Sequence, residues 1–569
     1  MTAESDPPSR MRGIRRWVPG VHLVKEYRRS WLRFDLVAGL VLAAILVPQG
    51  MAYAELAGLP PVTGLYTTIA CLVAYAAFGP SPVLVLGPDS AVSPLIFAAI
   101  TPLLVAGSDP GKAIVLAGML AVIVGLIEVG LGVGKLGFVA DLLSKEVQVG
   151  YMNGLGITII VGQLPKLFGF STSGSGFVND IHQFFLNIDQ TNLTTLAVGT
   201  GVLAILLVLP RFSPMVPAVL VAVVGATALS ALLDLAAKGV AVIGPLPHGV
   251  PSPGVPWTNI SDVGPLFVAA IGITLVSLTD TIATATSFAA RRGDEVDPDQ
   301  EMIGIGVSNI STGFFQGFAI STSASRTAVA EQAGAKSQVT GLVGAGVVAL
   351  MLLAFNSLLA DLPQTALAAV VIAAALSLMD VKALRHYARI RWSALALSLV
   401  ATIGVVMLGV LQGILVAVVL SILLFFKTYW MPRNAVLGHV EEIGGWHNVD
   451  RFPNTEEVEG IVVYRWEAPL FFANSSAFQR SIRELVRDRH PRWIVLDCAA
   501  VTDLDVTAAG MLKVLDDDLN DHGIHLAFVD LRSHLQELVE RYGLDESLDS
   551  EHFYTSIDQA LEDIDRLEG

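Results

Sequence analysis

Uncharged stretches long enough to cross a membrane recur along this chain of 569 residues. A membrane-crossing helix needs about 20 predominantly apolar residues to cover a hydrocarbon core roughly 30 Å thick. Charged residues make up only 15% of the chain, against about 25% in an ordinary globular protein. These features exclude a series of soluble domains and predict a polytopic α-helical membrane protein. Clear examples of such stretches are Leu36–Ala54, Ser337–Ala360 and Trp392–Phe426.

The last quarter of the chain has a different character. From Arg433 onward it carries 12 Lys and Arg against 28 Asp and Glu, which accounts for the whole net charge of −16. Short apolar runs alternate there with helix-like segments, so we expect a small α/β domain. Its acidity disfavours nucleic acid as a partner. The expected strands are 461–464, 493–497 and 525–529, and the expected helices are 475–488, 507–519 and 533–542.

The distribution of Lys and Arg predicts the orientation in the membrane, because these residues concentrate in cytoplasmic loops. Residues 10–33 carry eight of them, so we expect a cytoplasmic N-terminal segment over 1–33. Phe170–Asn192 is poor in Lys and Arg and rich in Gly and Ser, which is typical of an irregular exterior loop. The transmembrane domain, 34–432, then returns the chain to the inside. The acidic domain, 433–569, is expected in the cytoplasm of a multi-pass protein that contacts the lipid of the cell membrane.

Two apolar segments are interrupted in the same way. One reads Pro82-Val-Leu-Val-Leu-Gly-Pro-Asp-Ser-Ala-Val-Ser93, and the other reads Gly317-Phe-Ala-Ile-Ser-Thr-Ser-Ala-Ser-Arg-Thr327. In each, a short apolar run meets helix-breaking or small polar residues before a helix-compatible stretch. Irregular backbone survives at membrane depth only where protein or a water-filled cavity covers it. Such breaks at matching places in two halves of a chain indicate the binding site of a transporter.

These breaks predict a site for an anion. A half-helix that begins inside the membrane directs unpaired N–H groups into the cavity and carries roughly +0.5 charge at that end. Two such ends suffice to bind an anion, and Arg326 adds a permanent charge with up to five donors. The Ser and Thr hydroxyls of 321–325 can replace water around an oxyanion. The alternative is that Arg326 extends to the membrane interface while the hydroxyl run only packs against neighbouring helices.

Carboxylates within apolar segments are candidates for coupling. Asp280 is the single charge between Val263 and Ala290, and Thr284 lies one turn along the same helix face. Their oxygens suit Na⁺, or a proton in its place. Asp89 is either a helix N-cap that points away from the anion or a group that is protonated when the anion binds. Glu128 is either a helix-packing partner or a candidate proton relay.

Several stretches together resemble the sulfate permease (SulP) family of anion transporters, and the tail resembles a STAS domain. The likeness covers about residues 17–565. It rests on several motifs in the same order as in the family, so it is specific at family level. The transporter motifs are Pro48-Gln-Gly-Met-Ala-Tyr-Ala54, Gly58-Leu-Pro-Pro-Val-Thr-Gly-Leu-Tyr66, Val85-Leu-Gly-Pro88 and Ser323-Ala-Ser-Arg-Thr327; the tail motifs are Ala468-Pro-Leu-Phe-Phe-Ala-Asn474 and Val501-Thr-Asp-Leu-Asp-Val-Thr507.

The resemblance implies about fourteen spans in two inverted repeats of seven, about 34–240 and 262–432. It also implies UraA-like core and gate domains, a homodimer and an elevator-like movement. Thr507 matches a region phosphorylated in related bacterial proteins, and Asp280 and Thr284 match Na⁺-binding positions of bicarbonate-transporting members. The residues implied to line the anion site are Gln49, Tyr53, Gly87, Asp89, Ser90, Ala91, Ser323, Ala324, Ser325, Arg326 and Thr327.

The sequence therefore predicts a secondary active transporter of a small inorganic oxyanion, sulfate or bicarbonate, coupled to H⁺ or Na⁺ as its only expected cofactor. A C4-dicarboxylate transporter is the alternative, since the same groups would hold a carboxylate. An uncoupled anion channel or exchanger is a second alternative. The chain has only two cysteines, Cys71 and Cys498, and no His in an expected core span. An enzyme, a disulfide framework and a thiolate metal site are therefore not expected.

Overall fold

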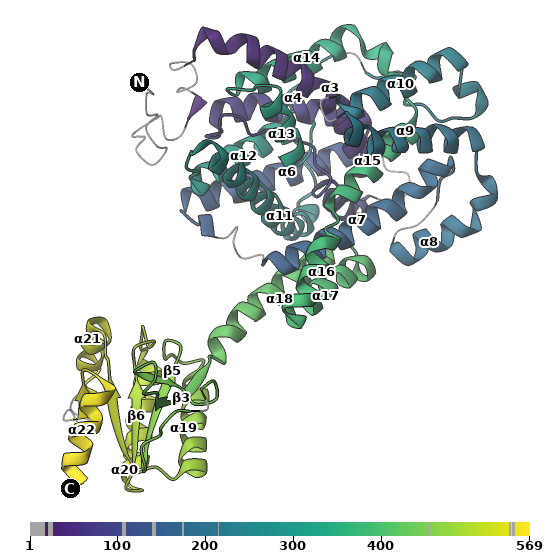
Figure 1. The fold of residues 1–569 in the computed structure, drawn as a ribbon. Coiled ribbons are helices and arrows are strands. Elements are labelled where there is room, and N and C mark those ends of the chain that lie inside the picture. The colour runs from purple at the N-terminus through teal and green to yellow at the C-terminus, as the bar shows by residue number, and fades with distance from the viewer. Residues whose placement is uncertain are drawn as a thin grey trace. The chain divides into compact units, whose positions relative to one another are not determined.

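A computed structural model of the chain describes residues 18–20, 27–104, 110–138, 144–172, 176–213, 216–247, 249–452, 454–544, 548 and 552–568. The chain divides into two compact units, Met1–Ser421 and Ile422–Gly569, which are described separately (Figure 1). Most of the N-terminal segment expected over 1–33 lies outside the described residues.

The first half of the membrane unit is a series of apolar helices with one interruption. The helices α3 and α4 are followed by a two-residue strand, β1, and by the short helix α5, which is where the first break was expected. In chain order the elements are α3 (Leu32–Leu56), α4 (Pro61–Phe78), β1 (Leu86–Gly87), α5 (Ser93–Ile100), α6 (Pro110–Val133), α7 (Lys145–Phe168), α8 (Phe177–Leu186), α9 (Leu193–Phe212) and α10 (Ala218–Leu233).

The second half repeats this order, with two helices, a two-residue strand, a short helix and a further helix. Within the described residues, six helices of the membrane unit are long and apolar enough to cross a membrane, and five apolar helices are shorter. The elements are α11 (Ile260–Arg292), α12 (Pro298–Phe314), β2 (Ser321–Thr322), α13 (Ala324–Gln332), α14 (Val339–Ala354), α15 (Gln364–Leu378), α16 (Val381–Ile390), α17 (Trp392–Leu408) and α18 (Val410–Trp430).

The helices of this unit form two groups. In one group α6 packs along α12 and α11, while α14 packs on α3 and α4. In the other group α7 packs between α15 and α17, and α9 packs on α10 and α15. Figure 1 shows α6, α11 and α12 side by side. The division gives two sets of mutually packed helices, with α3 and α15 in contact between them.

Paired glycines let α6 and α12 approach closely. A Cβ placed on Gly125 would lie 2.4 Å from the carbonyl oxygen of Gly306, and one on Gly313 would lie 2.5 Å from that of Gly118. Both distances are too short for any side chain. Small residues bring helix backbones together in this way within membranes, where burial of apolar surface gives no driving force.

The segment 170–192 was expected to be an irregular loop, and this prediction was wrong. It contains the helix α8, whose Phe184 packs edge-to-face on Phe168 and at a tilt against Phe170, at ring-centroid distances of 5.0 and 5.7 Å. The Gly and Ser residues that suggested a loop lie before the helix. The apolar residues of α8 recur at helical spacing, but the helix is too short for this pattern to outweigh the loop signal of the Gly and Ser residues.

The C-terminal unit is a six-stranded mixed sheet with the order β4-β3-β5-β6-β7-β8. The expected strands and helices are all present, while β3, β4, β8 and α22 were not foreseen. The buried apolar residues of α19, α20 and α21 pack on one face of the sheet, and those of α22 pack on the other. The bounds are β3 (Asn434–His439), β4 (Trp446–Asn448), β5 (Ile461–Trp466), α19 (Ser475–Arg489), β6 (Trp493–Asp497), α20 (Val506–Asn520), β7 (His525–Val529), α21 (Ser533–Arg541), β8 (Phe553–Tyr554) and α22 (Ile557–Glu568).

Both cysteines are free and buried. Cys498 lies directly after β6 and is only 3% exposed. It is a core side chain of the C-terminal unit, and this burial raises the pKa of its thiol above the ordinary value.

A buried carboxylate connects the start of α3 to the start of α14. Asp35 is fully buried and accepts hydrogen bonds from the backbone N–H groups of Lys336 and Ser337 at 2.7 and 3.1 Å. The hydroxyls of Ser337 and Thr340 donate to it at 2.7 and 3.0 Å. Four donors from the residues just before α14 and from its first turn therefore bind one carboxylate.

Asp35→Ala leaves these donors buried without an acceptor. Because each such group costs roughly 1–3 kcal/mol, we expect the substitution to destabilise the membrane unit by about 3 kcal/mol. The measurement is the melting temperature of the purified protein in detergent. Asp361→Ala, at an exposed carboxylate, is the matched control and should change stability by no more than about 0.5 kcal/mol. Equal melting temperatures for the two variants would contradict the assigned role of Asp35.

Candidate anion site

A cavity of about 1450 Å³ opens within the membrane unit. Its lining comes from α3, α11 and α13 of one helix group and from α7, α9, α10 and α15 of the other, together with the segment after β1. It contains most of the residues singled out in the sequence. Those that line it are Gln49, Tyr53, Asp89, Ser90, Asp280, Thr284, Ser323, Ala324, Ser325 and Arg326.

The two interrupted segments meet at this cavity, as the sequence predicted. The strands β1 and β2 pair antiparallel, with Leu86 opposite Thr322 and Gly87 opposite Ser321. The N–H of Val85 also donates to the hydroxyl of Thr327 at 3.1 Å. The backbone groups exposed by the breaks are thus partly satisfied by each other rather than by lipid.

The second half-helix begins where it was expected, and the first begins later. Ser323 caps α13 through its hydroxyl, which accepts from the N–H of Arg326 at 3.4 Å. Asp89 was one candidate for the N-cap of the first half-helix, but α5 begins at Ser93 with Val92 at its N-cap. Residues 90–92 form a turn instead, closed by the Ser93 N–H bonding to the carbonyl of Asp89 at 3.0 Å. The turn therefore separates the N-terminus of α5 from the paired strands β1 and β2.

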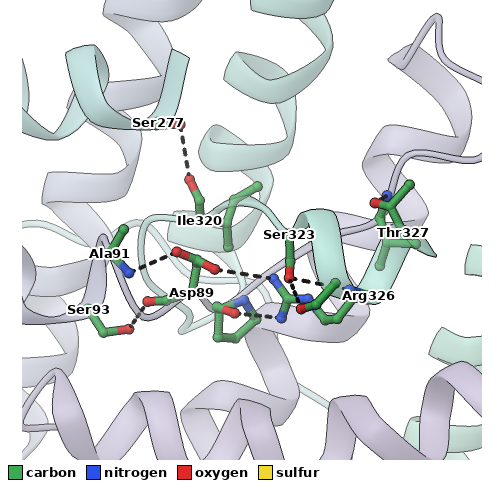
Figure 2. A network of polar contacts seen from close by, with 11 residues as sticks. Asp89, Ala91, Ser93, Ser277, Ile320, Ser323, Arg326 and Thr327 are labelled. Carbon is green, nitrogen blue, oxygen red and sulfur yellow. Dashed lines mark hydrogen bonds and ion pairs between the residues drawn. The ribbon is translucent and has the colours of Figure 1, made fainter. Parts of the chain in front are cut away.

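Arg326 lies inside the protein and does not extend to the membrane interface. Its side chain is 1% exposed, and its Nη1 donates to the carbonyl oxygen of Pro88 at 2.6 Å (Figure 2). Its Nη2 lies 3.9 Å from Oδ1 of Asp89. The Nε and Nη2 groups are buried and have no hydrogen-bond partner among the described residues. The alternative in which Arg326 snorkels is therefore wrong, and the guanidinium keeps free donors at the cavity.

Asp89 lies in the turn before α5 and faces Arg326. Its Oδ2 accepts from the N–H of Ala91 at 2.8 Å, and its carbonyl accepts from the hydroxyl of Ser93 at 2.7 Å, so it organises the turn before α5. Its other carboxylate oxygen is directed toward Arg326 (Figure 2). Of the two alternatives, the one in which Asp89 caps the helix and points away from the site is wrong, because Val92 occupies the N-cap of α5 and one oxygen of Asp89 faces Arg326.

A second group of oxygen atoms lies on α11. Asp280 and Thr284 both line the cavity, and Gln148 on α7 donates to Oδ1 of Asp280 at 3.4 Å. Within the part of the chain that the structure describes, no group of three or more His, Cys, Asp or Glu is placed to hold a metal ion. A cation at this place would therefore be held by Asp280 together with hydroxyl, amide or carbonyl oxygens.

Five of the residues singled out do not line the cavity. A Cβ on Gly87 would lie 3.1 Å from Nη1 of Arg326, so Gly87 allows the guanidinium to approach the strand. Ala91 and Thr327 are buried behind the lining. Glu128 on α6 is buried and accepts from Asn309 on α12 at 2.7 Å. Thr507 belongs to the C-terminal unit, where it is exposed in the first turn of α20.

Sequence reasoning missed three residues that the structure connects to the site. Gln148 reaches Asp280 from the first turn of α7. Asp380, which caps α16 through the N–H of Ala383 at 2.8 Å, lines the same cavity. Asn309 is fully buried and accepts from the N–H of Ile320, directly before β2, at 2.8 Å. The signal for Asn309 was weak, because the neighbouring Ser308, Ser311 and Thr312 of α12 are polar as well.

The fold and this cavity define a helical membrane protein of transporter type with an appended α/β domain. The model of the sulfate permease family matches residues 32–401, and the STAS domain model matches residues 452–560. The chain belongs to the sulfate permease family and carries a STAS domain. Its relatives are transporters and not enzymes.

Relatives match along nearly the whole chain. A probable sulfate transporter of Mycobacterium tuberculosis is 40% identical over 549 residues, which cover 96% of this chain and 98% of that protein. Probable sulfate transporter 3.3 of Arabidopsis thaliana is 30% identical, with 93% of this chain and 86% of the relative covered.

Solved structures share the fold at lower identity. Murine Solute Carrier 26 family member A9, an anion transporter in the inward-facing state, aligns with a TM-score of 0.89 at 24% identity, covering 99% of this chain and 96% of that one. The transmembrane domain of the cyanobacterial bicarbonate transporter BicA aligns with a TM-score of 0.61 at 20% identity, covering 69% and 98%.

Arg326→Ala removes the buried positive charge from the cavity. Charge-assisted hydrogen bonds are worth roughly 1.5–3 kcal/mol each, so we expect anion affinity to fall by about tenfold or more. The measurement is concentration-dependent sulfate uptake into proteoliposomes, with size-exclusion chromatography as the check on folding. Arg326→Lys should recover part of the affinity, because it keeps the charge without the planar fork. Saturable uptake with unchanged affinity in Arg326→Ala would remove Arg326 from the site.

Proposed function

We propose that this protein is a secondary active transporter of a small inorganic oxyanion, sulfate or bicarbonate. The observation that carries the proposal is the buried Arg326, with unpartnered N–H groups, at a cavity formed where two interrupted segments cross. A guanidinium with free donors beside a helix N-terminus favours an oxyanion. The hydroxyls of Ser90, Ser323 and Ser325 lie at the same cavity and can take the place of hydration water.

Coupling to H⁺ or Na⁺ is proposed at Asp280 and Thr284, which offer a carboxylate and a hydroxyl on one face of α11. Asp89 is a further proton-binding candidate because it lies beside Arg326. Glu128 is the weaker candidate for a proton relay. It does not line the cavity and is bound to Asn309, so helix packing is the better account of it.

The proposed movement is an elevator-type change of access. The cavity lies between two helix groups, each packed within itself, which is the arrangement that a core domain sliding against a gate domain requires. The recurring element order supports about fourteen spans in two inverted repeats of seven, over about 34–240 and 262–432. We also propose a homodimer in the cell membrane, surrounded by lipid, with the N-terminal segment and the STAS domain over 433–569 in the cytoplasm.

Two other transport functions stay open. The cavity of about 1450 Å³ is larger than a small inorganic anion needs, so a C4-dicarboxylate would also fit. An uncoupled channel or exchanger would use the same anion site without the carboxylate on α11. The STAS domain is proposed to be regulatory. Thr507 is exposed near the N-terminus of α20, where a phosphate would meet the favourable end of the helix dipole.

Uptake by purified protein in liposomes tests the proposed function. We expect saturable uptake of sulfate or bicarbonate that an imposed H⁺ or Na⁺ gradient drives above equilibrium. Fumarate in parallel assays distinguishes the dicarboxylate alternative, and conductance without a coupling gradient distinguishes the channel. Uptake of none of these anions under any gradient would contradict the proposal.

Asp280→Asn should separate coupling from anion binding. The amide keeps the shape of the side chain but cannot carry the charge that attracts a cation, so we expect exchange of anions across the membrane to continue while gradient-driven accumulation is lost. Gln148→Ala is the comparison variant, because it removes the side chain that donates to Asp280 at 3.4 Å but leaves the carboxylate, so it should retain accumulation. An Asp280→Asn protein that still concentrates its substrate would show that Asp280 is structural.

A further inference from the structure

A carboxylate of the protein itself lies beside the guanidinium at the anion site. Oδ1 of Asp89 and Nη2 of Arg326 are 3.9 Å apart, an ion-pair distance that is too long for a direct hydrogen bond. Figure 2 shows the two side chains facing each other from the two crossing segments. Both line the cavity. Asp89 therefore lies next to the cation that a substrate oxyanion would approach.

The guanidinium is only partly satisfied by this arrangement. Its Nη1 bonds to the carbonyl of Pro88, while Nε and Nη2 are buried with no hydrogen-bond partner among the described residues. A buried N–H group without a partner is unfavourable, and arginine cannot relieve this by losing its proton. Arg326 therefore has donor capacity left for an acceptor that comes closer than the carboxylate of Asp89 does.

The charge at this place depends on one proton. Asp89 and Arg326 carry no net charge together when both are ionised, and one positive charge when Asp89 is protonated. Oδ2 of Asp89 is held by the N–H of Ala91 at 2.8 Å, so the carboxyl group stays near Arg326 in either form. An incoming anion therefore meets a neutral ion pair when Asp89 is ionised, and a net positive charge on Arg326 when Asp89 is protonated.

We propose that the carboxylate of Asp89 is an internal competitor for the substrate anion, and that the anion binds to Arg326 together with one proton on Asp89. The inference rests on the proposed transport function and adds a proton on Asp89 to the coupling ion proposed at Asp280. Water on the entry side supplies the proton, which forms the O–H bond of the carboxyl group. Release of the anion lets this proton leave to water on the exit side, and the carboxylate then neutralises Arg326 again.

Linkage makes this coupling reciprocal. If protonation of Asp89 strengthens anion binding by some factor, anion binding strengthens protonation by the same factor. The other ionisable groups that face Asp89 are Arg326 on α13, Asp280 on α11, Tyr53 on α3 and Tyr151 on α7. Asp280 is the rival proton acceptor, but no cation is paired with it among the described residues, so its protonation would not release a guanidinium for the anion.

Sulfate binding to the purified protein in nanodiscs, measured by calorimetry from about pH 5 to about pH 8, tests the inference. Sulfate stays doubly charged over this range, so any pH dependence belongs to the protein. We expect the wild-type affinity to rise by up to about tenfold for each pH unit of acidification where Asp89 titrates. Asp89→Asn should bind with an affinity that no longer changes with pH, because its amide can still accept from Ala91 but never carries a charge.

One variant acts as a control for the position of the proton. Asp380→Asn removes a carboxylate that lines the same cavity and keeps an N-capping side chain for α16, so it should retain the wild-type pH dependence. A pH dependence that persists in Asp89→Asn, or that disappears in Asp380→Asn, would overturn the inference.

A measurement on the wild type alone covers the case in which Asp89→Asn does not fold. Addition of sulfate to the protein in weakly buffered solution should cause uptake of about one proton per bound anion at a pH where Asp89 is ionised. Sulfate binding without proton uptake at every pH would overturn the inference and leave the transport function intact. Failure of the wild type to bind or transport any of the test anions would instead contradict the transport function itself.

Discussion

The membrane unit depends on the interaction of the buried Arg326 guanidinium with the opposite interrupted segment. Backbone groups at that depth cannot bond to lipid, so β1 and β2 pair with each other where their helices are absent. Arg326 adds a bond from α13 to the carbonyl of Pro88 on the opposite segment. The same residues that satisfy the broken backbone therefore also place positive charge at the cavity.

The surrounding helices make this irregular arrangement possible. Glycine contacts bring the backbones of α6 and α12 close together. Asn309 on α12 connects this helix pair to the second break, since its amide donates to Glu128 on α6 and accepts from Ile320 before β2. These contacts link the packing of α12 to the anion site, because a shift of α12 would also move β2, which leads to Arg326.

The sequence allowed the class of fold, the meeting of the two breaks and most of the polar residues around Arg326 to be predicted, because each rests on a local signal. Apolar length predicts spans, and Gly87-Pro88 and the Ser and Thr run at 321–325 predict interruptions. Hydrogen-bond partners that are distant in the sequence leave no such local signal. Glu301, fully buried and bound by the Tyr75 hydroxyl at 2.6 Å, resembled a residue of an ordinary acidic loop. The start of α5 at Ser93 depended on a turn that propensity alone does not fix.

The position of Asp35 bears on how the protein is made. Its hydrogen-bond donors lie 301, 302 and 305 residues further along the chain, at the start of α14. A ribosome has therefore translated more than half of the polypeptide before this acid in the first long helix finds its partners. Until then the carboxyl group of Asp35 lacks the donors that it has in the folded protein. Its place in the first turn of α3 lets water hydrate it at the end of the helix until the later segments emerge.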